Sequence, residues 1–231
     1  MFEPIEGQEI DISYCLKLVV DSSLSDKYRV FGSVLATALL GKPHRKIGDI
    51  DLILDSSKLD YFLNKLKKLG FVVYLRIMKF MGIKFEWIEI EKKDKLGFTV
   101  FPGDLTDQGF VITLSKNIKL IVPKEAIKST KYIFDDVSFS GIPSEYAYLG
   151  ALRSKRNPKR KYDLAIFEAK MRTESSKGLK DIEFWYKNTR VGWIYPFLTF
   201  MQNLLGFLAL RLGKSYDFWR DMNWGIDEKR L

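Results

Sequence analysis

Two short segments decide the fold: Val30-Phe31-Gly32-Ser33 and, after 15 further residues, Asp49-Ile50-Asp51-Leu52. The first segment is typical of a short apolar strand that ends in a glycine-serine bend. The second alternates acidic and apolar residues, which is typical of a strand with one polar face and one buried face. Because side chains two residues apart in a strand point the same way, Asp49 and Asp51 are predicted to present both carboxylates to one spot.

These residue types predict a metal and phosphate site. Two carboxylates this close repel each other unless a cation lies between them, and hard oxygen ligands suit Mg²⁺, which also accepts phosphate oxygens. Gly32 lets the backbone approach a ligand closely, and Ser33 opens the next predicted helix, whose free N–H groups favour a phosphate. The pattern therefore predicts a site for a nucleoside triphosphate. The alternative is an ordinary glycine-serine turn beside a solvent-facing strand.

The surrounding segments predict an α/β fold with a mixed sheet. Helices are predicted over 11–20, 34–40 and 56–70, and strands over 27–31, 49–54, 71–81 and 83–91. Ser56-Ser57 is expected to cap the third helix, and the last two strands to form a hairpin around Gly82. Further strands are expected over 98–122, separated by Pro102-Gly103-Asp104 and Ser115-Lys116-Asn117.

Beyond these strands the sequence predicts a change of architecture. Sheet residues are expected to end near Gly141, and helices to follow from Pro143, with a break at Asn157-Pro158. We therefore expect a core over 1–142 and a C-terminal helical region over 143–231, with a linker near 173–178.

Composition narrows the chemistry. The 231 residues suffice for one domain with a small second one, and 38 Lys and Arg against 29 Asp and Glu give a net charge of +9. This balance suits polyanionic partners such as nucleotides or nucleic acid, although many soluble proteins are as basic. A single cysteine, Cys15, and a single histidine, His44, exclude an internal disulfide and a Cys/His zinc site within the chain. A bound metal must therefore use carboxylates.

One segment raises the question of a membrane. Residues 191–210 carry no charge over 20 residues, which is long enough to cross a bilayer. Gln202 and Asn203 at its centre, together with Pro196, favour instead a helix buried in the C-terminal region. The acidic N-terminus has no apolar segment typical of a signal peptide, so a cytoplasmic protein without membrane attachment is expected.

In this order of elements the chain resembles the nucleotidyltransferase superfamily related to DNA polymerase β. The pattern of that superfamily is an apolar residue, Gly and Gly or Ser, a spacer, and then Asp-apolar-Asp, and the resemblance covers about residues 28–91. It implies two Mg²⁺ ions on the acidic residues. It also implies transfer of a nucleoside monophosphate from a triphosphate such as ATP to an acceptor hydroxyl, with release of pyrophosphate.

Within the superfamily, the pattern is most similar to the abortive-infection type of nucleotidyltransferase toxins of toxin–antitoxin systems and their relatives. Arg45 stands four residues before Asp49, where this family usually has an arginine, and residues 160–164 resemble its Arg-x-Lys-Asp helix motif. The resemblance implies that Arg45, Lys161 and Asp163 bind the nucleotide together with Gly32 and Ser33.

Two positions depart from that family. Ile47 stands where Ser or Thr is usual, and Tyr148 stands about where a catalytic lysine is usual, with Lys155 as a substitute one or two turns later. The departure at Tyr148, together with the ambiguity of the third acid, favours a second hypothesis beside the enzyme, namely a catalytically inactive module of the same fold that binds nucleotide or RNA.

A third carboxylate is expected on a neighbouring strand. Glu86 is favoured because it shares a strand face with Ile88 and Ile90, and a lone acid on an apolar face is costly unless something binds it. Glu89, which shares the opposite face with Glu91, is the alternative, and Glu86, Glu89 and Glu91 are all solvated if none of them binds a metal. The predicted catalytic and metal set is Asp49, Asp51 and Glu86.

Other polar and aromatic groups leave the acceptor open. Residues 152–161 hold a run of Lys and Arg without an acid, which suits a triphosphate or an RNA backbone but also a solvated helix end. His44 lies in a loop near the acids and is expected to be exposed. Six aromatic residues near the C-terminus are expected in the core rather than stacking on bases: Trp185, Tyr186, Trp193, Tyr195, Trp219 and Trp224. A tRNA end, a protein hydroxyl, a small molecule such as an antibiotic and another nucleotide all remain candidate acceptors.

Overall fold

The structure, a computed structural model, describes residues 6–80, 83–153, 157–170, 183–186, 189–214 and 226–231. Four sequence predictions concern residues outside these ranges: the hairpin turn at Gly82, the candidate Lys155, the linker near 173–178, and the placement of Trp219 and Trp224.

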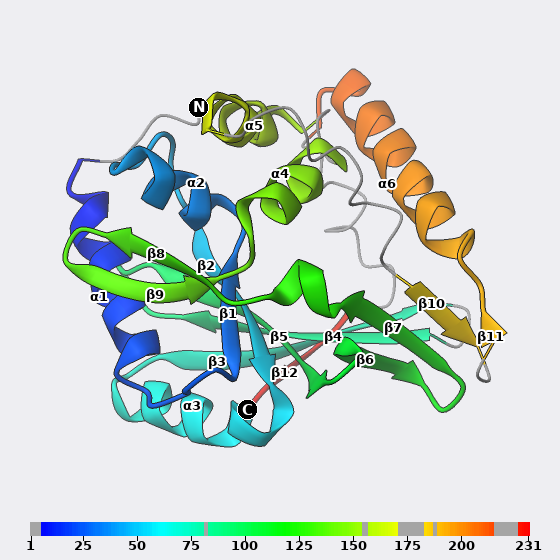
Figure 1. Ribbon diagram of the computed structural model, residues 1–231, viewed down its shortest axis with the longest axis horizontal. Helices are drawn as coiled ribbons and strands as arrows, with labels where there is room; N and C mark the ends of the chain where they lie inside the picture. The colour runs from blue at the N-terminus through cyan, green and yellow to red at the C-terminus, as the bar shows by residue number, and fades with distance from the viewer. Residues whose placement is uncertain (1–5, 81–82, 154–156, 171–182, 187–188, 215–225) are drawn as a thin grey trace.

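Helices and strands alternate through the first 70 residues and strands dominate afterwards (Figure 1). The described helices are α1 (Gln8–Val20), α2 (Ser33–Leu40), α3 (Ser56–Lys68), the 3₁₀ helix η1 (Lys124–Ile127), α4 (Ser144–Arg153), α5 (Pro158–Lys170) and α6 (Ile194–Arg211). The described strands are β1 (Tyr28–Phe31), β2 (Asp49–Asp55), β3 (Val72–Phe80), β4 (Ile83–Glu91), β5 (Gly97–Thr106), β6 (Gly109–Ser115), β7 (Ile118–Pro123), β8 (Thr130–Phe134), β9 (Val137–Gly141), β10 (Glu183–Tyr186), β11 (Thr189–Arg190) and β12 (Ile226–Arg230).

The strands form one mixed sheet centred on β2. β2 pairs antiparallel with β1 on one side and parallel with β5 on the other. From β5 the sheet branches, with β4, β3 and β12 on one branch and β6, β7, β10 and β11 on the other. The predicted mixed α/β architecture is therefore confirmed, and β2 with its two aspartates lies in the interior of the sheet.

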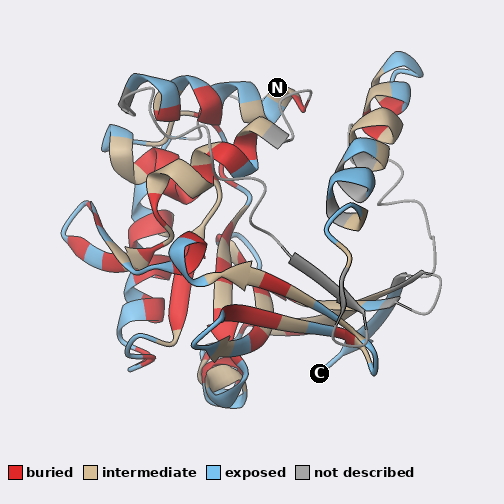
Figure 2. Ribbon diagram, turned by 45° about the vertical axis from the view of Figure 1, so that its right-hand side comes forward, coloured by how far each residue is buried: buried red, intermediate tan, exposed pale blue. Residues whose placement is uncertain are grey.

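The core explains the alternation of β2. Ile50, Leu52 and Leu54 are fully buried. On the same sheet face, Phe98 of β5 meets Phe62 of α3 edge to face at 5.8 Å between ring centroids. Helix α3 therefore covers this face, and the odd-numbered residues of β2 point to the other one. Buried residues gather on the central strands and nearby helices, whereas α6 carries mostly intermediate and exposed residues (Figure 2).

Two local predictions were wrong. The N-cap of α3 is Asp55 and not Ser56-Ser57. The Asp55 side chain accepts a hydrogen bond from the Ser57 backbone N–H. Pro102-Gly103-Asp104 does not separate two strands, since β5 runs through it to Thr106. Gly103 allows this continuity because a Cβ there would overlap with Phe110 of β6, so the glycine lets the next strand approach closely.

The sheet also does not end at Gly141. β10 pairs antiparallel with β7, and β12 returns from the C-terminus to pair antiparallel with β3. These short strands lack a local pattern strong enough to predict them, because their pairing depends on distant strands. Helices α4, α5 and α6 do lie in the predicted C-terminal region, and the division at residues 142 and 143 stays a prediction.

The uncharged segment 191–210 forms most of α6. Among the described helices, none combines the length and the apolar character that crossing a membrane requires. Trp193 at the start of α6 is 68% exposed, so the expectation that it lies in the core was wrong.

Candidate active site

The two aspartates of β2 lie on the sheet face opposite the core. Both are half-buried, while Ile50 between them is fully buried. Asp51 is the direct neighbour of Phe31 on β1 and of Thr99 on β5. The Thr99 hydroxyl donates a hydrogen bond to Asp49 Oδ2, which fixes the orientation of that carboxylate. The strand thus presents two acidic side chains side by side, as the sequence pattern predicts.

Electrostatics at Asp51 favour the addition of a positive charge. Burial raises the pKa of Asp51 well above its ordinary value, and the charge of Asp49 raises it further. Arg160 and Arg45 act in the opposite direction but are outweighed. Because the charged form of this carboxyl is disfavoured, a cation bound between the two aspartates would relieve both the burial cost and the repulsion.

Gly32 and the start of α2 lie against Asp51. Gly32 has φ +77° and ψ −150°, a conformation that only glycine adopts easily. A Cβ at this position would overlap with Asp51 Oδ2. Ser33 is the first residue of α2 and is buried. The structure therefore brings Gly32, Ser33, Asp49 and Asp51 together, with the N-terminal end of a helix directed toward the carboxylates.

We expect Gly32→Ala to lower the free energy of unfolding by about 2 kcal/mol or more, because it adds backbone strain and a clash with Asp51. It is also expected to weaken Mg²⁺-dependent ATP binding, which calorimetry measures. Gly41→Ala is the matched control: Gly41 also has a positive φ, of +78°, but a Cβ there meets nothing within 4 Å. The control should lose some stability and keep ATP binding. Equal losses of binding in both variants would contradict a specific role for Gly32.

A second polar cluster joins the loop before β2 to helix α5. Asp163, 1% exposed, accepts hydrogen bonds from His44 Nε2 at 2.8 Å, Arg45 Nε at 3.0 Å and Arg160 Nη1 at 3.1 Å. Burial by itself would raise the pKa of Asp163, but the hydrogen bonds from His44 and Arg45 and the two arginine charges hold it well below its ordinary value. The cluster clamps α5 against the loop that leads into the aspartate strand.

This cluster contains residues for which predictions were made from the sequence: His44, Arg45 and Asp163. His44 was expected to be exposed, which was wrong: its side chain is 5% exposed, because Asp163 and Thr37 pair with its two ring nitrogens. Arg45 is also buried, and its guanidinium contacts Asp163 and the Lys46 carbonyl. The nucleotide-binding roles expected of Arg45 and Asp163 stay predictions, and in this structure the two side chains bind each other.

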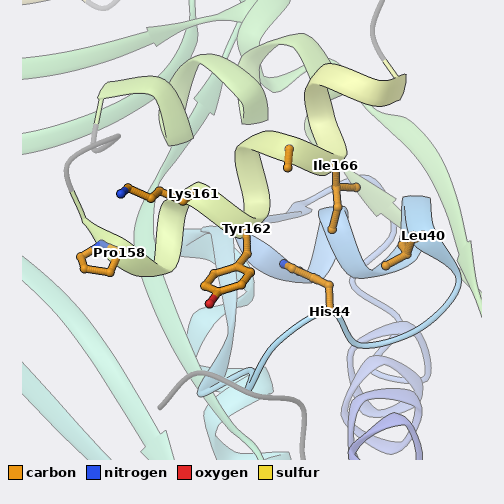
Figure 3. A pocket seen from close by; sticks show the side chains of 7 residues that line it. Leu40, His44, Pro158, Lys161, Tyr162 and Ile166 are labelled. Carbon is orange, nitrogen blue, oxygen red and sulfur yellow. The ribbon is translucent and has the colours of Figure 1, made fainter.

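Arg160 is a functional candidate that the sequence indicated only as part of the basic run 152–161 and of the motif stretch 160–164, and not among the predicted nucleotide-binding residues. Its side chain is 33% exposed, unlike that of Arg45, and its charge acts on Asp51. The sequence signals for Arg160 were therefore the same as those for Lys161. Lys161 is exposed and lines an open cavity between α2 and α5 (Figure 3).

This cavity has a volume of about 750 Å³, and the side chains that border it include Leu40, His44, Tyr162 and Ile166 (Figure 3). Neither aspartate lines it. The cavity is therefore separate from the carboxylate pair, and His44 is the residue that connects it to Asp163.

Strand register separates the two candidates for a third carboxylate. Ile88 of β4 pairs with Val100 of β5, which places Glu86 on the core side of the sheet, where it contacts Lys84. Glu89 pairs with Thr99 and so shares a face with the aspartates, and it accepts hydrogen bonds from Arg76 Nε at 2.8 Å and Trp87 Nε1 at 3.0 Å. The structure thus does not bring Glu86 to the aspartates.

Thr99 occupies the position next to Asp51 on the neighbouring strand, and Glu89 lies one strand further away. Within the described part of the chain, no three acidic, histidine or cysteine side chains are arranged as metal ligands.

The two departures from the toxin pattern are Ile47 and Tyr148. Ile47 is buried, and Tyr148 packs against the core. Neither of these side chains joins the aspartates by any described contact.

No family model matches the chain, and no curated protein is similar to it in sequence. Solved structures are similar in fold. A lincosamide antibiotic adenylyltransferase, LnuA, bound to lincomycin, has a TM-score of 0.55 at 17% identity over 74% of this chain and 100% of its own. ANT(2")-Ia in complex with adenylyl-2"-tobramycin has a TM-score of 0.50 at 14% identity over 71% of this chain and 91% of its own. The chain therefore has the nucleotidyltransferase fold.

Proposed function

We propose that this protein is a nucleotidyltransferase that moves a nucleoside monophosphate from a triphosphate to an acceptor hydroxyl and releases pyrophosphate. The observation that carries the proposal is the pair Asp49 and Asp51, which stand on one sheet face against the Gly32 bend at the start of α2. The similarity in fold to adenylyltransferases supports this assignment. Nucleotidyl transfer requires phosphate groups and carboxylates at the same point, and the Gly32 bend, the start of α2 and the aspartate pair provide that arrangement.

The residues present fit a divalent cation. Asp49 and Asp51 offer hard oxygen ligands, and burial together with the charge of Asp49 raises the pKa of Asp51 despite the opposing charges of Arg160 and Arg45. When bound, Mg²⁺ would supply charge neutralisation at the transferred phosphate and activation of the acceptor hydroxyl. Since Thr99 stands beside the pair instead of an acid, the remaining ligands would come from phosphate oxygens and water.

The side chains around the pair have separate tasks. The backbone at Gly32 and the first N–H groups of α2 bind the phosphates, while Arg160 at the edge of the Asp163 cluster contributes a positive charge. Thr99 holds Asp49 in place, and the Asp163 cluster holds α5 and Arg160 near the site. Phosphoryl chemistry depends on positioning and charge stabilisation, so no general-base histidine is required.

The Thr99 hydrogen bond gives a measurable prediction. Thr99→Val keeps the shape of the side chain but removes the bond to Asp49, and we expect Mg²⁺-dependent ATP affinity to fall about three- to tenfold. Thr113→Val, at an exposed site on β6, is the matched control. Isothermal titration calorimetry of both variants measures the effect. An unchanged affinity in Thr99→Val would show that Asp49 does not need this partner.

A second candidate function is a nucleotide-binding module without turnover. The threonine beside Asp51, where an acid would complete a set of three, favours it. Incubation with labelled triphosphates, Mg²⁺ and a panel of acceptors distinguishes the two functions, with tRNA, lincomycin and tobramycin as the first acceptors. Labelled product that disappears with EDTA supports the enzyme. Tight Mg²⁺-dependent nucleotide binding with no labelled product on any acceptor, including those in a cell extract, supports the module.

A further inference from the structure

A row of aromatic side chains crosses the sheet beside the aspartates. We call it the aromatic row, and it consists of Phe31 on β1, Phe101 on β5, and Phe85 and Trp87 on β4. Ring centroids are 5.5 Å apart for Phe31 and Phe101, 6.0 Å for Phe101 and Phe85, and 6.0 Å for Phe85 and Trp87. All four side chains are half-buried, so each keeps part of its surface accessible.

Strand register places the aromatic row on the same face as the carboxylates. Phe31 is the direct cross-strand neighbour of Asp51. Phe101 lies two residues after Thr99, the other neighbour of Asp51, and therefore points the same way. Trp87 lies two residues before Glu89, which pairs with Thr99. The apolar row and the acidic pair thus form one continuous surface.

The geometry of in-line displacement places the acceptor on this surface. The helix N-terminus and Arg160, which bind phosphates in the proposed function, lie at the ends of β1 and α5. In an in-line displacement, the attacking oxygen approaches from the side opposite the leaving pyrophosphate. Strands β5 and β4 lie on the other side of β2 from β1, and they carry most of the aromatic row.

The charges along the row disfavour an anionic ligand. Glu89 binds the indole N–H of Trp87 and the guanidinium of Arg76, so it orients that ring. Arg76 also contacts Glu228 of β12, so that two glutamates surround this one arginine. The described side chains here form no excess of positive charge, whereas binding a nucleic-acid backbone depends on such an excess.

We propose that the aromatic row is an acceptor subsite that binds a small molecule carrying its hydroxyl on a planar ring without negative charge. The proposal rests on the proposed function, because it takes Asp49 and Asp51 as the point of transfer. A ring stacked on Phe101 or Phe85 would lie one to two strands from Asp51, and the rings of the row, tilted by 35–55° to their neighbours, leave aromatic surface that suits a further planar group. A planar ring brings its whole face into such contacts, whereas a saturated ring brings only part of its C–H groups.

The test compares a planar alcohol with its saturated counterpart. The full chain is titrated with 2-naphthol and with decahydro-2-naphthol, with and without Mg²⁺ and a non-hydrolysable ATP analogue, and binding is followed by ligand-observed NMR. We expect 2-naphthol to bind at least fivefold more tightly. Phe101→Leu should remove this preference, while Tyr61→Leu, at an exposed ring on α3, should keep it. Phe85→Leu carries the same test if Phe101→Leu does not fold.

Three outcomes would overturn the proposal: equal affinity for the two alcohols, a preference that persists in the Phe101 and Phe85 variants, or binding of a short RNA that depends on these rings while 2-naphthol does not bind. The ATP analogue separates this proposal from the function on which it rests. Equal affinity of the unmodified chain for the two alcohols, with Mg²⁺-dependent analogue binding intact, rejects the acceptor subsite alone. Absence of analogue binding in the unmodified chain rejects the proposed function.

Discussion

Asp51→Asn is expected to reduce Mg²⁺-dependent pyrophosphate release at least about a thousand-fold, which corresponds to about 4 kcal/mol of transition-state stabilisation. The substitution keeps the size of the side chain and removes one of the two charges that would hold the cation. It is measured with labelled ATP and the acceptor that gives product with the unmodified protein.

The same substitution is expected to raise the melting temperature at pH 7 without Mg²⁺. Burial and Asp49 raise the pKa of Asp51, so the folded protein holds a proton there more tightly than the unfolded chain does. Its ionisation therefore costs stability as the pH rises through the window above the ordinary aspartate value, and a neutral amide avoids that cost. Loss of activity with a higher melting temperature separates a functional effect from misfolding.

Asp60→Asn is the control for this experiment, since Asp60 is an exposed acid on α3, which covers the opposite sheet face. It should leave both activity and melting temperature nearly unchanged. If Asp51→Asn released pyrophosphate at the rate of the unmodified protein, the assignment of the acidic pair would be wrong.

Asp163→Asn is expected to have the largest effect on stability, a loss of about 3–5 kcal/mol at pH 7. The substitution leaves Arg45 buried without its carboxylate and weakens the contact to His44. Urea unfolding followed by circular dichroism measures the difference. Asp136→Asn, which affects an exposed ion pair with Lys17, is the control and should unfold almost as the unmodified protein does.

The pH dependence of this effect has a defined sign. His44 and the arginines lower the pKa of Asp163 in the folded protein, so its contribution to stability is present above the ordinary aspartate value of about 3.9. It is lost as the pH falls below that value toward the pKa in the folded state. The stability difference between the unmodified protein and Asp163→Asn should therefore shrink below about pH 4. A difference that grows with acid would contradict the paired state of Asp163.

The aspartate strand shows how much of the site local sequence can predict. Asp49, Asp51, Gly32 and Ser33 lie within 20 residues, and each has a pattern that neighbouring residues establish: alternation in the strand and a glycine at the bend. Side-chain alternation and positive-φ positions are local properties, so they can be predicted without knowing the tertiary contacts.

The third acid and His44 show where that prediction stops. Both faces of β4 carry glutamates, and only the pairing of β4 with β5 decides that Glu89 rather than Glu86 shares the face of the aspartates. His44 is buried by Asp163, which lies 119 residues away in the sequence. No local pattern encodes either fact.

Local sequence was enough to predict the strand, bend and helix that bring two carboxylates to the start of α2, because backbone geometry and side-chain periodicity depend on adjacent residues. Long-range packing places the groups that surround the pair: Thr99 beside Asp49, the Asp163 cluster that holds α5, the aromatic row, and the return of β12 to β3. These depend on strand register and on burial of charges between distant segments, and both are set only when the whole chain packs together.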